Sequence, residues 1–160
     1  MIDDGRDETE LERADRNFAE LLQELRVMQA GVQILFAFLL TVPLQARYGS
    51  LDGFQRGVLV ATLLVLVAAI ALLVAPVAWH RLMFRRQVKE TVVIAASRLA
   101  QAGLGALGVA VACAMLLVLD LVLSRLFAVV LAAVVGGLLL VMWLVLPLIW
   151  RARLAAAVEG

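Results

Sequence analysis

The stretch Glu20 to Gln45 reads ELLQELRVMQAGVQILFAFLLTVPLQ and passes from a charged amphipathic helix into a membrane span without a break. Polar residues recur inside it: Arg26, Gln29, Gln33, Thr41 and Gln45. Burying an amide in hydrocarbon costs free energy unless it finds a hydrogen-bond partner, so such side chains tend to face protein or water. The stretch therefore predicts a membrane helix, and it is the first place to look for a functional site.

The composition is that of an integral membrane protein. Of the 160 residues, 64% are hydrophobic, and long runs carry no charge. This is more apolar sequence than a soluble core of this size needs. Nine of the thirteen acidic residues lie between Asp3 and Glu24, in a segment with no apolar run of the kind a signal peptide has. We therefore expect the first membrane span to be its own insertion signal.

The apolar runs predict an all-α, polytopic protein with four transmembrane helices. A bilayer core of about 30 Å needs about 20 helical residues. Residues 102–150 form one apolar run interrupted only by Asp120, Ser124 and Arg125, so this run must turn back near Ser124. The predicted organisation is a charged amphipathic helix over 1–26, continuous with the first span; a transmembrane domain over 27–150, with spans at 27–46, 57–79, 102–123 and 126–150; and a tail over 151–160.

Positive charge predicts the orientation of the chain. Eleven Arg and Lys residues lie on the side that would hold both termini and the middle loop, against three on the other side. Cytoplasmic loops carry the excess of Arg and Lys in membrane proteins. We expect a multi-pass protein of the plasma (inner) membrane with both termini in the cytoplasm.

Apolar residues follow a three-four alternation through the first helix, which is the pattern of a heptad seam. The seam continues from the charged segment into the membrane, through Leu11, Ala14, Phe18, Leu21, Leu25, Met28, Val32, Leu35, Leu39 and Val42. The charged half could pack on the basic middle segment, lie along the membrane surface, or form a coiled coil with other protomers. We expect a homo-oligomer.

Five polar residues form a possible ion pathway or an inter-helix polar network: Arg26, Gln29, Gln33, Thr41 and Asp120. The first three fall within about one sector of the helix. The four-residue row that continues through Gln33 and Thr41 drifts by about 40° at each step, so it winds instead of forming one pore stripe. Asp120 lies five residues before Arg125; the two could satisfy each other, or the carboxylate could bind a proton or cation.

Other features predict contacts with lipid and between helices. Arg81, Arg85, Arg86 and Lys89 are expected to meet anionic lipid headgroups, or alternatively the acidic N-terminal tail. Small residues recur every four positions in both halves of the last hairpin, a spacing that allows close helix approach. Asp52 and Gln55 have the spacing of a capping box at the start of the second span.

Motifs for catalysis and cofactor binding are absent from the sequence. It has no glycine-rich nucleotide loop, no HExxH, and one His and one Cys (Cys113) far apart. We expect no enzyme activity, no cofactor, no metal site and no nucleic-acid partner.

Three stretches carry a family resemblance: FAELLQELRVMQAGVQILFAFLL, LDGFQRGVLVATLL and APVAWHRLMFRRQVKE. Over residues 15–125 the chain resembles a family of small actinobacterial four-helix membrane proteins, catalogued as a domain of unknown function. Some members carry an automatic sodium:proton antiporter label. The resemblance implies this architecture and supplies no catalytic residues.

Two functions follow from these patterns. The first is an oligomeric small-cation or proton channel or exchanger. The second is a non-transporting membrane accessory or scaffold protein that binds a cytoplasmic partner through its acidic helix and basic loop.

Overall fold

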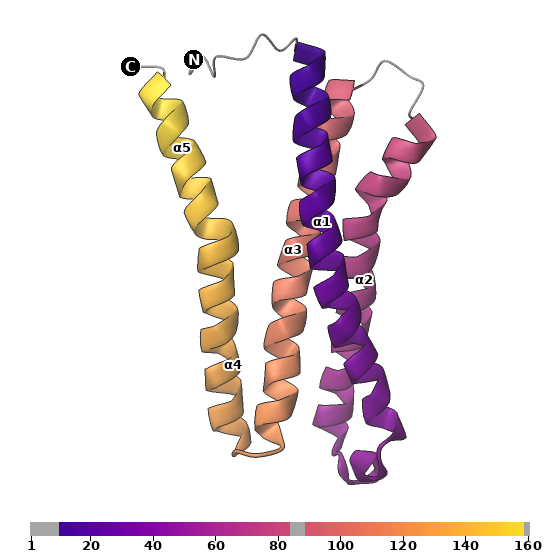
Figure 1. The fold of residues 1–160 in the computed structure, drawn as a ribbon. Coiled ribbons are helices and arrows are strands. Elements are labelled where there is room, and N and C mark those ends of the chain that lie inside the picture. The colour runs from indigo at the N-terminus through magenta and orange to yellow at the C-terminus, as the bar shows by residue number, and fades with distance from the viewer. Residues whose placement is uncertain (1–9, 84–88, 159–160) are drawn as a thin grey trace.

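The computed structural model describes residues 10–83 and 89–158, and the elements in this part of the chain are all helical. Figure 1 shows long helices running side by side, with the described termini, the start of α1 and the end of α5, at the same end of the molecule. Four stretches are long and apolar enough to cross a membrane: Leu22–Leu44, Gly53–Trp79, Ala95–Asp120 and Arg125–Trp150. The prediction of an all-α protein with four candidate spans and a continuous first helix is confirmed. The elements in order are α1 (Glu10–Thr41), η1 (Val42–Leu44), η2 (Ala46–Ser50), α2 (Gly53–Met83), α3 (Lys89–Asp120), α4 (Arg125–Leu140), η3 (Val141–Val145) and α5 (Leu146–Val158).

The core lies between α1, α2 and α3, and each helix contributes a row of buried residues with heptad spacing. The three rows are Leu25, Val32 and Leu39 of α1; Leu59, Leu66 and Leu73 of α2; and Ala96, Gly103, Ala110 and Leu117 of α3. Rows with this period are the geometry of left-handed helix packing, in which side chains of one helix fit between those of its neighbour.

This packing shows where the membrane half of the heptad seam lies. The heptad seam of α1, wherever its side chains are described, lies against the core that α1 shares with α2 and α3. For the charged half of α1, packing on the basic segment, a surface position and a coiled coil with other protomers stay open predictions, because the side chains of its seam lie outside the described ones. Leucine-rich seams bury equally well within a chain or between chains, so periodicity alone could not distinguish the two.

The last two helices stand apart from this core. α4 packs on α3, and its buried residues are the two small ones, Ala128 and Ala132. The π-helical turn η3 then joins α4 to α5, and α5 contacts only this turn among the described elements. As Figure 1 shows, α5 diverges from α3 toward the end of the molecule that carries the termini.

Candidate functional site

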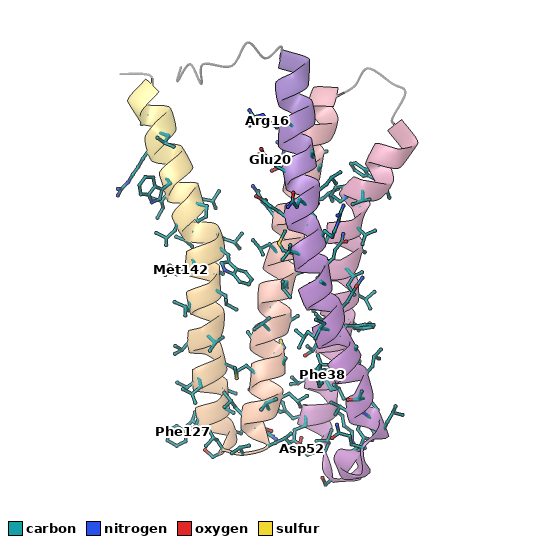
Figure 2. All side chains as sticks on the ribbon, in the orientation of Figure 1. Arg16, Glu20, Phe38, Asp52, Phe127 and Met142 are labelled. Carbon is teal, nitrogen blue, oxygen red and sulfur yellow. The ribbon has the colours of Figure 1, made fainter. Side chains whose placement is uncertain are left out.

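A polar cluster joins the helices at the end of the bundle opposite the termini. We call it the loop-end clasp: Asp52, Gln55, Asp120 and Arg125. It begins with the capping box at the start of α2, where the backbone N–H of Gln55 donates to Asp52 Oδ1 at 2.9 Å. In return the backbone N–H of Asp52 donates to Gln55 Oε1 at 3.1 Å. The capping box predicted from the spacing of these two residues is confirmed, and Figure 2 places Asp52 at this end.

Asp120 is the buried member of the loop-end clasp, with a side chain that is 3% exposed. Arg125 bonds the Asp120 carboxylate in a bidentate manner: Nε donates to Oδ1 and Nη2 donates to Oδ2, both at 3.2 Å. The side-chain amide of Gln55 donates to Oδ2 at 2.9 Å. Protein donors therefore occupy both oxygens of this carboxylate, as in the pairing with Arg125 that the sequence offered as one alternative.

Arg125 extends the loop-end clasp to the start of α2. Its guanidinium also bonds Asp52, and it lies over the ring of Phe54, 4.3 Å from the centroid. The bidentate contact suits the planar guanidinium of Arg and could not be made by Lys. The backbone N–H of Gln55 and the side chain of Arg125 hold the pKa of Asp52 below its ordinary value. The clasp thus ties the α1–α2 connection and α2 to the α3–α4 hairpin.

Two other predicted polar residues bond backbone carbonyls. Gln29 Nε2 donates to the carbonyl oxygen of Leu73 in α2 at 2.9 Å. Thr41 Oγ1 donates to the carbonyl oxygen of Phe38, one turn back in its own helix, at 2.7 Å. Asp120 lies in α3 near the opposite end of the bundle from Arg26, so the structure does not bring the five predicted residues together into one network.

The exposed side of α1 carries a second row with three-four spacing. We call it the α1 polar face: Gln23, Arg26, Ala30, Gln33 and Ala37. At 100° per residue these five positions lie within about 80° of the helix circumference. All are exposed. Sequence reasoning followed the four-residue row through Gln29 and Thr41 and missed this straighter one, although the same periodicity could have revealed it.

Gln33 is the central residue of the span Leu22–Leu44, eleven residues from either end. Within residues 10–83 and 89–158, neither its amide nor the Arg26 guanidinium has a hydrogen bond or ion pair. An amide moved into hydrocarbon without a partner costs about 4–8 kcal/mol on a cyclohexane scale. The α1 polar face thus carries, at the centre of a candidate membrane span, an amide with no partner among the described residues.

The remaining predicted residues lie where little is described. Arg85 and Arg86 fall outside the described residues, and for Arg81 and Lys89 only the helical backbone is described. Their contact with anionic headgroups stays a prediction. The described residues include no group of three or more His, Cys, Asp or Glu that could hold a metal ion.

Comparison with known proteins matches the chain to a family. A family described as a "Family of unknown function (DUF6328)" matches residues 7–147, which is most of the chain. No curated protein and no solved structure matches.

Proposed function

The chain belongs to this family of unknown function, and we propose that it is a non-enzymatic membrane accessory protein that assembles with copies of itself through the α1 polar face. The observation that carries the proposal is the exposed Gln33 amide at the centre of the first span. Interhelical amide contacts and small residues are what drive association between membrane helices, since lipid supplies no hydrophobic force between them.

A second copy of the chain fits this face better than another occupant. Copies inserted in the same orientation place the same residue at the same depth. An amide carries both a donor and an acceptor, so Gln33 of one protomer can satisfy Gln33 of the next. Ala30 and Ala37 lie about one turn to either side, and their small side chains let two backbones approach closely.

Ion transport receives less support from the same residues. Asp120 accepts hydrogen bonds from Arg125 and Gln55, and the Gln29 amide donates to a backbone carbonyl of α2. An assembly around a central axis would place a ring of Arg26 side chains at one mouth, and rings of positive charge favour anions over cations. This arrangement counts against a sodium or proton pathway and favours the accessory function, with the charged N-terminal helix available to a cytoplasmic partner.

Disulfide crosslinking in native membranes tests the proposal. In a Cys113→Ala background, Gln33→Cys should give a dimer on oxidation. The matched control is Ile34→Cys, which lies at the same depth, is 60% exposed and points 100° away. Gln33→Leu should weaken association of the purified protein in mild detergent by about three- to twentyfold. Equal crosslinking at both positions, or unchanged association of Gln33→Leu, would contradict the proposed interface.

Liposome flux separates the two functions. The purified protein in liposomes should pass no more protons, sodium or potassium than empty liposomes under a gradient of each ion. If the protein passes ions above that background and Gln33→Leu abolishes the flux, the protein is a transporter and the proposed accessory function is wrong.

A further inference from the structure

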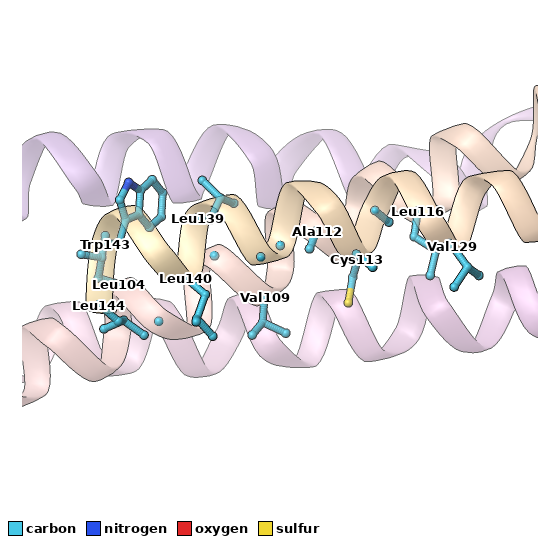
Figure 3. Close-up of a pocket in the computed structure, with 16 residues that line it drawn as sticks. Leu104, Val109, Ala112, Cys113, Leu116, Val129, Leu139, Leu140, Trp143 and Leu144 are labelled. Atoms are coloured by element: carbon cyan, nitrogen blue, oxygen red, sulfur yellow. The ribbon is translucent and has the colours of Figure 1, made fainter. Parts of the chain in front are cut away.

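A cavity of about 620 Å³ lies between α3 and α4, on the side of α3 away from the core. Figure 3 shows its walls, with Trp143 and Leu144 at one end and Leu116 and Val129 at the other. Its floor is made by small residues of the two helices: Gly105, Gly108 and Ala112 of α3, with Ala132, Ala133, Gly136 and Gly137 of α4. All sixteen lining residues are uncharged, and the residues on both helices lie within candidate membrane spans.

The shape of this cavity follows from the helices that border it. Gly136 lies close to Ala112, so close that an added Cβ would be 3.3 Å from the Ala112 Cβ. Beyond this contact the π-helical turn η3 carries Trp143 across to Gly108, where an added Cβ would lie 3.8 Å from the indole ring. Past η3 the chain of α5 leaves α3. The result is an elongated apolar groove that opens toward the end of the molecule carrying the termini.

Polar groups stand at this open end. Arg98 precedes Gly105 by seven residues and Gln101 precedes Gly108 by seven, so both continue the groove-lining face of α3 about two turns, or about 10 Å, farther on. Both are exposed, and within the described residues neither has a hydrogen bond or ion pair. The indole N–H of Trp143 likewise has no partner in the described part of the chain.

We infer that this groove binds an anionic phospholipid, with an acyl chain between α3 and α4 and the phosphate against Arg98 and Gln101. The apolar lining suits a hydrocarbon chain and offers nothing to a polar ligand, and its volume is within the usual range of ligand cavities. The positive charge and the amide at the open end match a phosphate headgroup. This charge complementarity distinguishes a lipid from a second protein helix, which would bring no anion to that point.

Native mass spectrometry of the delipidated full-length protein tests the inference with two probes, dioleoyl phosphatidylglycerol and dioleoyl phosphatidylcholine. The anionic lipid should bind about fivefold more tightly, the contribution of roughly one basic residue near a membrane surface. Arg98→Gln should remove this preference, whereas Arg56→Gln, at the opposite end of the bundle, should keep it. Equal binding of both lipids to the unmodified protein, or a preference that survives Arg98→Gln, would overturn the inference.

Two further measurements locate the acyl chain. Gly105→Leu should weaken binding of both lipids, while Gly105→Ala, whose Cβ would only reach ordinary contact with Leu144 at 3.9 Å, should bind normally. The single cysteine, Cys113, lines the groove, so added phosphatidylglycerol should slow its alkylation by N-ethylmaleimide. Unchanged alkylation, or a photocrosslinker at Val109 that captures a second copy of the chain in place of lipid, would show that lipid does not occupy this site.

Discussion

Gln29 of α1 donates its side-chain amide to the carbonyl oxygen of Leu73, three residues before Pro76 in α2. Proline has no N–H and clashes with the carbonyl four residues earlier, so it disturbs the helical bonding of this turn. Neighbouring helices can satisfy backbone groups that a proline frees inside a membrane. The carbonyl that loses its N–H donor to Pro76 is that of Leu72, and Gln29 bonds the next carbonyl of the same turn, that of the fully buried core residue Leu73.

Replacing Gln29 by Leu should destabilise the protein by about 0.6 kcal/mol, and at most about 1.7 kcal/mol, the range measured for interhelical hydrogen bonds in membranes. The measurement is unfolding of the purified protein in detergent. Gln33→Leu is the matched control, since it removes the same amide from the exposed side of the same helix and should leave monomer stability unchanged. A larger loss for Gln33→Leu than for Gln29→Leu would contradict this assignment.

The same bond should be coupled to Pro76. In a Pro76→Ala background the Leu72 carbonyl regains its N–H donor and the turn becomes regular, so the neighbouring Leu73 carbonyl depends less on Gln29. Gln29→Leu should then cost less than it does in the unmodified protein. A double-mutant cycle over these two positions measures the coupling, and purely additive losses would show that the proline and the amide act independently.

Gly103 sets the spacing of α3 against α2 at the same level. A Cβ at this position would lie 2.8 Å from the Leu73 side chain and 3.3 Å from Leu72 Cβ. Gly103→Ala should therefore destabilise the protein by roughly 1–3 kcal/mol, as overpacked cores do. Gly57→Ala in α2 is the control, because its added Cβ meets nothing within 4 Å. Equal melting temperatures for the two variants would mean that Leu73 moves aside freely.

How far the sequence predicts this molecule depends on the kind of contact. The four apolar runs and the turn near Ser124 require only hydropathy and length, which the chain itself carries. The Asp52–Gln55 cap and the Asp120–Arg125 pair are local in sequence, three and five residues apart, so spacing predicts them as well. The bond between Gln29 and Leu73 spans 44 residues, and its acceptor is a backbone carbonyl that every residue possesses. Composition gives no sign of such a partner.

The groove beside α4 was also beyond prediction from sequence. The small residues of the last hairpin predict close approach along its whole length, and near the hairpin turn α3 and α4 do pack together. The π-helical turn at Val141–Val145 redirects the helix farther on, and its residues, VMWLV, read as an ordinary apolar helix. This local change in helix winding places Trp143 and Leu144 at one end of the groove and marks where the chain leaves α3.

Removing the guanidinium of Arg125 should be the most damaging single change in the loop-end clasp. Arg125→Met leaves the nearly buried Asp120 carboxylate without its counter-charge, so the melting temperature should fall by more than it does for Gln29→Leu. Arg56→Met should have a small effect. Arg56 is a cation at the same end of the bundle, and among the described residues it bonds the Gly49 carbonyl and lies over the Tyr48 ring. The double variant Arg125→Met with Asp120→Asn should recover part of the loss. A double variant that is less stable than Arg125→Met alone would show that the unpaired carboxylate is not the cause.

The contribution of Asp52 to stability should depend on pH in one direction. The backbone N–H of Gln55 and the Arg125 side chain hold its pKa below the ordinary Asp value of about 3.9. A carboxyl group whose pKa is lower in the folded state stabilises the protein above that ordinary pKa, and the stabilisation is lost as the pH falls through the folded value. Asp52→Asn should therefore have a lower melting temperature than the unmodified protein at neutral pH. The difference in melting temperature should become smaller below about pH 4. Arg56→Gln is the control, because the Arg56 guanidinium stays protonated throughout this pH range, so the melting temperature of this variant should differ from that of the unmodified protein by a constant amount. If the difference in melting temperature for Asp52→Asn is equally constant down to acid pH, the ion pair with Arg125 is not its source.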